Sequence, residues 1–374
     1  MRHGCDAEEV IGACHSLPVM QRWSVGANHA TICAGVIGSV AMNCERQLLS
    51  DRTVDPAMSQ PVASICIRKR ITAMPTATAD DHIDYALGKL RWMREQRIWP
   101  NGPRYLWTDA FGLVLLLSLH RQLAEQRYLD EAAWLVREVK RVLGRPRGIR
   151  IGEAADRDGQ YFHYLAMWLF ALGRLGELVP AYREEGVALV RDIHSAFVIP
   201  GTGVIWKMQE DLSAPYPGYG LGALDAFDGY VAYRLLDEDA LAPEIAQMRD
   251  LIERDHRRLA VDQDLGLGMM LWLAHFFPKE NWAQLQTSRS LATLDHMWID
   301  PPGYVCRAPG LPHVKFAFTN YGVSLGLQAV RQHEDRVEKL NRFFETYRSG
   351  DEYDHEAITH VMACTSHFPG EFIR

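Results

Sequence analysis

The chain has 374 residues, of which 48% are hydrophobic and 23% are charged, and its mean hydropathy is -0.17. These values are typical of a globular protein. A formal net charge of -7 and a pI near 6.1 argue against nucleic-acid binding, which usually needs a basic face. The best candidate for a membrane span, residues 34–42, is far shorter than the roughly 20 apolar residues that a bilayer requires. We therefore expect neither a nucleic-acid partner nor a membrane partner, and the oligomeric state stays open.

The first 77 residues show neither the period of a strand nor that of a helix, because Gly, Ser, Thr and Pro interrupt each apolar run. We therefore predict a poorly structured N-terminal arm over 1–77 and a folded domain over 78–374. An internal start at Met58 or Met74 would make the arm an artefact. The alternative is a genuine extension that docks on the domain.

The seven cysteines are scattered, five of them before residue 70, and none has CxxC spacing. This pattern indicates neither a disulfide framework nor a zinc site. We expect reduced thiols in a cytoplasmic protein without a signal peptide. The HExxH and phosphate-loop signatures are also missing, so we expect no metal and no cofactor.

From residue 80 onward the sequence predicts helices of two alternating kinds. The amphipathic helices cover 81–95, 127–143, 180–195, 240–258, 281–297 and 335–348. The helices that are apolar nearly all round, and rich in Gly, Ala and Ser, cover 106–120, 158–173, 221–236, 264–276, 319–332 and 352–365. Because a helix that is hydrophobic on every side must be buried, six outer and six inner helices predict an all-α (α/α)6 toroid. An open helical array is the alternative, but the series stops at six pairs without a polar capping repeat.

Polar residues gather at or near the predicted starts of the inner helices. They are Asp109, Asp158, His163, Asp225, Asp228, Asp264, Asn320, Asp354 and His360. N-capping explains part of this pattern, since Asp and Asn cap helices well and carboxylates favour the positive end of the helix dipole. Asp228 is harder to explain as a cap, because it lies one turn inside its helix on the same face as Asp225. A salt bridge from Asp228 to Arg234 or Lys207 is the structural alternative.

The loops that lead into the inner helices mix aromatic rings with charged and amide groups. Aromatic rings can stack on sugar faces, and carboxylates and amides can bind hydroxyl groups. We therefore predict a carbohydrate cleft at this end, although the rings could also simply cover the end of the barrel. The predicted substrate-binding residues are Trp107, Tyr161, Lys207, Tyr219, Asp225, Arg307, Asn320, Tyr321 and His360.

The segment LWTDAFGLVLLLSLHRQL resembles one in the unsaturated glucuronyl and rhamnogalacturonyl hydrolases of the six-hairpin glycosidase superfamily. The resemblance implies an (α/α)6 barrel over about residues 80–370, with Asp109 at the position of the family's general acid/base. In that family the aspartate protonates the double bond of an unsaturated uronic acid, which is then hydrated. This chain has no earlier hairpin with the family's second conserved aspartate. The N-acylglucosamine 2-epimerases share the barrel and use histidines on inner helices, which here would be His163 and His360.

We predict a carbohydrate-active enzyme, a glycoside hydrolase that acts on a small-molecule or oligosaccharide substrate containing a sugar or uronic acid. Asp109 would be the general acid/base, with Asp158 or Asp228 as its carboxylate partner. His163 and Lys207 would help to hold the substrate. The alternatives are a sugar isomerase using His163 and His360, and a non-catalytic helical toroid that binds a protein or an apolar ligand.

Overall fold

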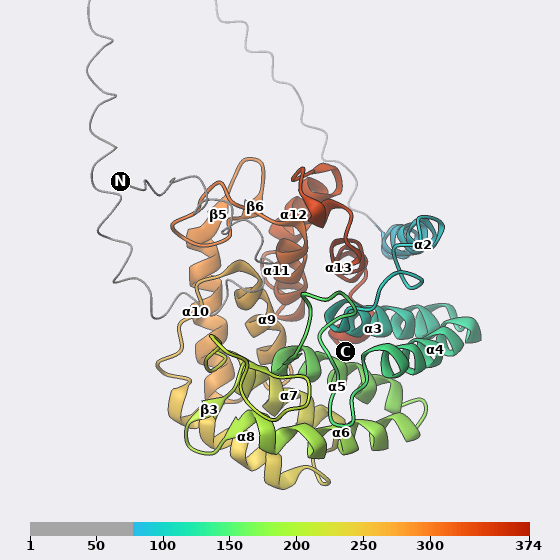
Figure 1. Ribbon diagram of the computed structural model, residues 1–374. Coiled ribbons are helices and arrows are strands. Elements are labelled where there is room, and N and C mark those ends of the chain that lie inside the picture. Colours follow the sequence, from blue (N-terminus) through green and yellow to red (C-terminus); the bar gives the residue numbers. More distant parts are fainter. Residues whose placement is uncertain (1–77) are drawn as a thin grey trace, which may run out of the picture. The chain divides into compact units, whose positions relative to one another are not determined.

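The computed structural model describes residues 78–374, and the arm predicted over 1–77 lies outside them. The described part is a barrel of two helical layers (Figure 1). The outer layer consists of α2 (Ala79–Glu95), α4 (Gln126–Leu143), α6 (Ala181–Phe197), α8 (Ala242–Asp255), α10 (Asn281–Met297) and α12 (Glu334–Thr346). The inner layer consists of α3 (Leu106–Leu123), α5 (Phe162–Gly176), α7 (Asp225–Asp237), α9 (Asp264–His275), α11 (Ala317–Ala329) and α13 (Ala357–His367).

The inner helices pack on one another in chain order, and α13 packs back on α3, which closes the ring (Figure 1). The seam between α7 and α9 has the sparsest contact. The predicted (α/α)6 architecture is therefore confirmed, and all six helical pairs lie where the sequence placed them. Three inner helices begin later than predicted: α5 begins after Asp158, α7 begins at Asp225 instead of residue 221, and α13 begins after the short helix η4 (Glu352–Asp354).

The close approach of α9 and α11 depends on glycine. A Cβ atom at Gly326 would lie 2.1 Å from the carbonyl oxygen of Gly268, and one at Gly268 would lie 2.5 Å from that of Gly322. Gly322 and Gly326 flank Ser324 with the GxSxG spacing of a nucleophile elbow. Ser324 instead lies in mid-helix, fully buried, with its hydroxyl bonded to Asn341 on α12. The motif is here a packing device.

Three short antiparallel pairs order the loops that precede inner helices. They are β1 (Gln160–Tyr161) with β4 (Lys207–Met208), β2 (Val198–Ile199) with β3 (Gly203–Val204), and β5 (Trp298–Ile299) with β6 (Tyr304–Val305). The β1–β4 pair ties the loop before α5 to the loop before α7, with Tyr161 opposite Lys207. The N-terminal ends of these inner helices are therefore held together, and we call this end of the barrel its mouth.

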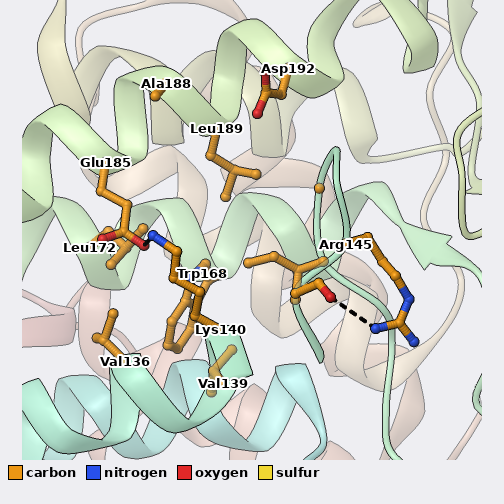
Figure 2. A pocket seen from close by; sticks show the side chains of 13 residues that line it. Val136, Val139, Lys140, Arg145, Trp168, Leu172, Glu185, Ala188, Leu189 and Asp192 are labelled. Carbon is orange, nitrogen blue, oxygen red and sulfur yellow. Dashed lines mark hydrogen bonds and ion pairs between the residues drawn. The ribbon is translucent and has the colours of Figure 1, made fainter. Parts of the chain in front are cut away.

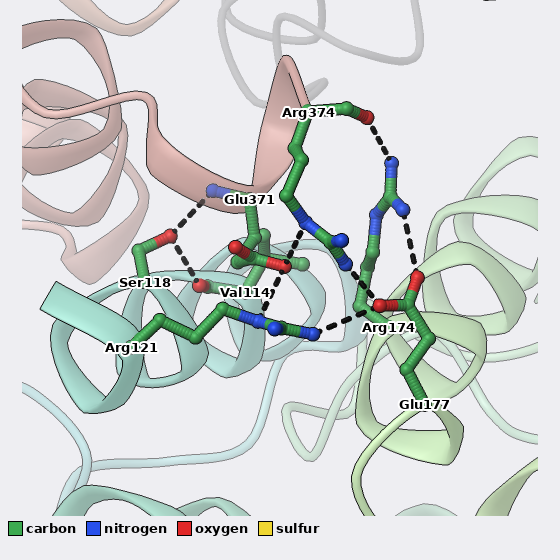
Figure 3. Close-up of polar contacts among 7 residues, drawn as sticks. All are labelled: Val114, Ser118, Arg121, Arg174, Glu177, Glu371 and Arg374. Atoms are coloured by element: carbon green, nitrogen blue, oxygen red, sulfur yellow. Dashed lines mark hydrogen bonds and ion pairs between the residues drawn. The ribbon is translucent and has the colours of Figure 1, made fainter. Parts of the chain in front are cut away.

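The opposite end of the barrel is closed by η5 (Gly370–Phe372) and the residues around it. Phe372 is fully buried, its ring lies 4.8 Å from that of Phe111, and its carbonyl oxygen accepts a hydrogen bond from Trp272. A network of ion pairs lies at the same end of the barrel (Figure 3). They join Arg121, Arg174, Glu177, Glu371 and Arg374. We call this closed end the floor of the barrel. Within residues 78–374, no helix combines the length and the apolar character needed to cross a bilayer.

Candidate active site at the mouth of the barrel

His163, the second residue of α5, lies in an aromatic cluster at the mouth. Its ring is parallel to that of Trp206 within 6° at a centroid distance of 5.9 Å, and the ring of Trp107 lies 5.9 Å away. Tyr164 and Tyr161 lie at 4.6 and 5.3 Å. The side chain is buried, with 8% of the residue exposed. Burial disfavours the imidazolium ion and lowers the pKa of His163 to about 3, so the ring is neutral at neutral pH.

Two carboxyl groups on the first turn of α7 adjoin this cluster. The Oδ1 atom of Asp225 lies 3.9 Å from Nδ1 of His163, and Asp228 shares its helix face. Burial raises the pKa of Asp225 well above its usual value, and the nearby Asp228 raises it further. Burial also raises the pKa of Asp228 to about 8. Asp228 therefore keeps a proton at neutral pH, and burial favours the neutral form of Asp225.

The salt bridges considered as an alternative for Asp228 do not form. Arg234 pairs with Glu280 at 2.6 Å and with Glu238 at 3.0 Å, and Lys207 pairs with Asp158 at 3.2 Å. Within residues 78–374, no lysine or arginine forms an ion pair with either carboxyl group of α7. This lack of a cation is why burial dominates their pKa values.

Asp109, in contrast, is enclosed at the start of α3, with no exposed surface. Its Oδ1 atom accepts hydrogen bonds from the Trp99 indole and the Arg104 guanidinium, both at 3.0 Å, and its Oδ2 atom accepts one from the Tyr105 amide at 3.3 Å. Burial raises the pKa of Asp109 to about 6, against the lowering effect of Arg104. Its contacts tie the loop before α3 to that helix.

Asp158 and Lys207 join two loops of the mouth. The ammonium group of Lys207 lies 3.7 Å from the ring centroid of Tyr216, and 5.0 and 5.3 Å from those of Tyr219 and Tyr161. The Tyr216 hydroxyl donates to Asp158 at 2.7 Å. Burial lowers the pKa of Lys207, although Asp158 opposes that shift. The ion pair inside this aromatic cage holds the β4 loop against the loop before α5.

The remaining candidates on α9 and α11 are engaged within the fold. Arg307 donates to Asp264 at 2.6 Å, and the Thr319 hydroxyl donates to the same carboxylate at 2.5 Å. Asn320 accepts from the Val305 amide at 2.8 Å and donates to the Val305 carbonyl oxygen at 3.1 Å. These contacts fasten the β6 loop to the inner ring.

His360 and Tyr321 face outer helices. The ring of His360 meets that of Trp92 on α2 edge to face at 4.7 Å, and Tyr321 packs against Phe344 on α12. Burial lowers the pKa of His360 to about 4, and Lys89 adds to the shift. Within residues 78–374, no ring contact or hydrogen bond joins His360 to His163.

Trp206 and Tyr164 belong to the cluster around His163 but were absent from the predicted site residues. Trp206 stood among the aromatic residues of its loop, and no sequence signal separated it from its neighbours. Tyr164 directly follows His163 on an apolar helix, where a tyrosine is typical of the core. The cluster combines residues from α3, α5 and the loop before α7, so it can be recognised only when the arrangement of these elements in space is known.

A cavity of about 170 Å³ lies outside the mouth, between α4, α5 and α6 (Figure 2). Trp168 and Leu172 line this cavity, and the Lys140–Glu185 ion pair lies at its edge. It contains none of the predicted site residues. Within the described part of the chain, no group of three or more His, Cys, Asp or Glu side chains could hold a metal ion.

No protein-family model and no curated protein matches this chain by sequence. Its structure is similar to that of a D-mannose isomerase, with a TM-score of 0.58 and 10% identity over 78% of this chain and 98% of that one. A cellobiose 2-epimerase from Spirochaeta thermophila has a TM-score of 0.54 and 14% identity over 79% and 99%. A GH76 α-mannanase from Bacteroides thetaiotaomicron has a TM-score of 0.56 and 10% identity over 77% and 96%. The chain has the (α/α)6 barrel fold of these enzymes. The resemblance found in the sequence is thus confirmed at the level of architecture.

Proposed function

We propose that this protein is an aldose–ketose isomerase for a small uncharged sugar, with its acid/base centre at His163, Asp225 and Asp228. One observation carries the proposal: the imidazole of His163 lies 3.9 Å from the carboxyl group of Asp225, and burial lowers the pKa of His163 while it raises those of Asp225 and Asp228. Environments that push the pKa values of neighbouring groups in opposite directions separate a base from an acid. Asp109 then has a structural role, which replaces the catalytic role that we predicted from sequence.

The residues present can carry out each proton transfer of such a reaction. His163 removes the proton from C2 of the open-chain aldose, and Asp228 donates its proton to the carbonyl oxygen at C1. The product is a neutral enediol, with an imidazolium ion that Asp225 and the ionised Asp228 stabilise. His163 then returns its proton to C1, and the hydroxyl at C2 returns its proton to Asp228, which yields the ketose. No other reactant is needed.

The charges at the mouth favour a neutral substrate over a uronic acid or a sugar phosphate. Three cations there are already paired within the fold: Lys207 with Asp158, Arg307 with Asp264, and Arg157 with Glu356. An anionic substrate that bound to one of these cations would have to displace its carboxylate. The floor around Phe372 also favours a small ligand, because it closes the far end of the barrel.

A single base favours isomerisation over two-base epimerisation. Epimerisation at C2 needs proton exchange on both faces of the carbon, which a second facing histidine would supply. His360, the candidate from sequence, packs against Trp92 instead. Enzymes named as a D-mannose isomerase and a cellobiose 2-epimerase share this fold, and both names describe rearrangement at the reducing end of a sugar.

The decisive experiment follows hydrogen exchange at C2 by NMR in deuterated water, with D-mannose and D-glucose as first substrates. We expect deuterium at C2 or C1 together with ketose formation. His163→Gln should abolish the exchange while the protein still melts cooperatively. His360→Gln is the matched control, since it removes an equally buried ring and should leave the exchange intact. Equal loss in both variants, or no exchange with any neutral aldose, would overturn the proposal.

Glycoside hydrolysis is the second candidate, because a protonated carboxyl group such as Asp228 is also the general acid that this reaction needs. The GH76 α-mannanase shares the fold. Release of reducing sugar from a mannan or an aryl mannoside, without deuterium at C2, would favour the hydrolase over the isomerase.

A further inference from the structure

A second cavity lies at the first turn of α7 and has a volume of about 320 Å³; its lining contains none of His163, Asp225 and Asp228. Its walls come from the β2–β3 turn, the start of α7 and the end of α8. The lining residues that matter for its chemistry are Leu221, Phe227, Leu251, Leu259, Asp255 and Arg258. An apolar cavity of about 150 Å³ already holds a benzene molecule, and small-molecule sites begin near 300 Å³. This cavity therefore has room for a ring with a short polar arm.

The charged residues at the rim of this cavity indicate which polar group a ligand should carry. Asp255 is already neutralised by Arg254, whose Nε donates to it at 2.8 Å, and Arg254 also holds the carbonyl oxygen of Thr202 at 2.8 Å. Within residues 78–374, the guanidinium group of Arg258 has neither a hydrogen bond nor an ion pair. The rim thus offers the guanidinium group of Arg258, which acts on Asp255 only through its charge, above apolar walls. This arrangement complements a carboxylate attached to an apolar body.

Gly222 forms the wall between this cavity and the acid/base centre. It lines the cavity, and its amide bonds to the carbonyl oxygen of Val204 at 2.9 Å. A Cβ atom at position 222 would lie 1.8 Å from Oδ2 of Asp225, so the carboxyl group packs directly on the glycine backbone. A molecule that contacts and displaces Gly222 from the cavity side therefore also displaces the carboxyl group of Asp225, which lies beside His163.

We propose that this cavity binds a small amphipathic monocarboxylate and that its occupant alters the acid/base centre through Gly222. The proposed binding depends only on the cavity and Arg258. The proposed effect of the ligand on turnover also rests on the proposed function.

Phenylacetate is the probe, and its uncharged isostere phenylacetamide is the ligand control. Titration of the full chain by calorimetry and ligand-observed NMR should show one saturable site, in the millimolar range or tighter as expected for a ligand of this size. Arg258→Gln should weaken phenylacetate binding by about tenfold or more, because it removes a charge-assisted hydrogen bond. Arg257→Gln, a change at the neighbouring exposed arginine that does not line the cavity, should leave binding unchanged.

Ala226→Leu provides a second test, because the larger side chain occupies the cavity and leucine keeps the helix propensity high. Binding should be lost while the thermal melt stays cooperative. The binding proposal is overturned if wild-type protein shows no saturable binding, or if Arg258→Gln binds phenylacetate as well as wild type does. If phenylacetate binds as expected but leaves the C2 exchange rate unchanged, the coupling through Gly222 is wrong. If no aldose is exchanged at all, the proposed function fails and the binding result still stands.

Discussion

The imidazole of His163 and the carboxyl group of Asp225 face each other across the contact between α5 and α7, with 3.9 Å between Nδ1 and Oδ1. Burial favours the neutral form of both groups, because it lowers the pKa of His163 and raises that of Asp225. One proton moved between them would convert a neutral pair into an ion pair. This is the relationship from which the acid/base proposal follows.

Asp228→Asn tests which carboxyl group gives up the proton. The amide is close in size to the protonated carboxyl group, so the fold should be unchanged, but it cannot donate an acidic proton. We expect the rate of C2 exchange to fall by about 10²-fold or more, as for loss of a general acid. Exchange measured at saturating substrate checks this, with circular dichroism as the control for folding. A rate within a few-fold of wild type would assign the proton transfer to Asp225.

The pH dependence of the rate follows from the same two groups. Asp228 has a pKa of about 8 and must be protonated, so the rate should fall as the pH rises through about 8. His163 has a pKa of about 3 and must be neutral, so no loss from this group is expected between pH 5 and 7. A pH–rate profile of C2 exchange tests both limbs. A rate that rises through pH 8 would contradict the assignment of Asp228 as the acid.

Stability should depend on pH through the same carboxyl group. Because the pKa of Asp228 is higher in the folded state than its ordinary value of 3.8, the folded state binds more protons between pH 4 and 8. The stabilisation is complete below about pH 4 and is lost as the pH rises through about 8. Asp228→Asn should therefore melt higher than wild type at pH 8.5 and close to it at pH 4. Parallel melting curves at both pH values would show that Asp228 is ionised in the folded protein.

The sequence predicts the architecture well because the outer helices have one apolar face with helical period, whereas the inner helices are apolar all round. Segments such as 106–120 and 264–276 are apolar all round, which leaves no position for them except the inner ring. The exact starts of inner helices were less predictable. Asp158 looks like a helix cap in sequence, but its pairing with Lys207 and Tyr216 holds it in the loop before α5.

The site was harder to predict, because an aspartate at a helix start looks the same whether or not a cation lies beside it. Asp109 and Asp264 receive arginine partners from loops, Arg104 and Arg307, whereas Asp225 adjoins a histidine. The partner comes from loop geometry, which the local pattern of residues does not contain. For the same reason, the sequence could group the two histidines by type but could not show which of them faces the mouth.

The Arg104–Asp109 ion pair yields a test of the structural role assigned to Asp109. Asp109→Asn keeps one acceptor oxygen, which can accept from the Trp99 indole or from the Tyr105 amide but not from both, and it leaves the buried Arg104 without a counter-charge. Removing one partner of a buried pair typically costs about 3–5 kcal/mol. We expect a loss toward the lower end of that range in urea unfolding, because Arg104 also donates to the Gly102 carbonyl oxygen at 2.8 Å. Unchanged stability together with a large loss of rate would restore the catalytic role predicted from sequence.

Phe372 of η5 is buried against the inner helices at the floor of the barrel. Its ring lies 4.8 Å from that of Phe111 and 6.0 Å from that of Phe170, so one side chain joins α3 and α5. Phe372→Ala should cost about 3–5 kcal/mol of unfolding free energy, since it removes a fully buried ring and leaves a cavity. Ile373→Ala is the matched control, because this neighbour is only partly buried and should cost clearly less. Urea unfolding of both variants measures the difference. Equal and small losses would show that η5 does not support the inner ring. Such a result would contradict a closed floor and the preference for a small ligand.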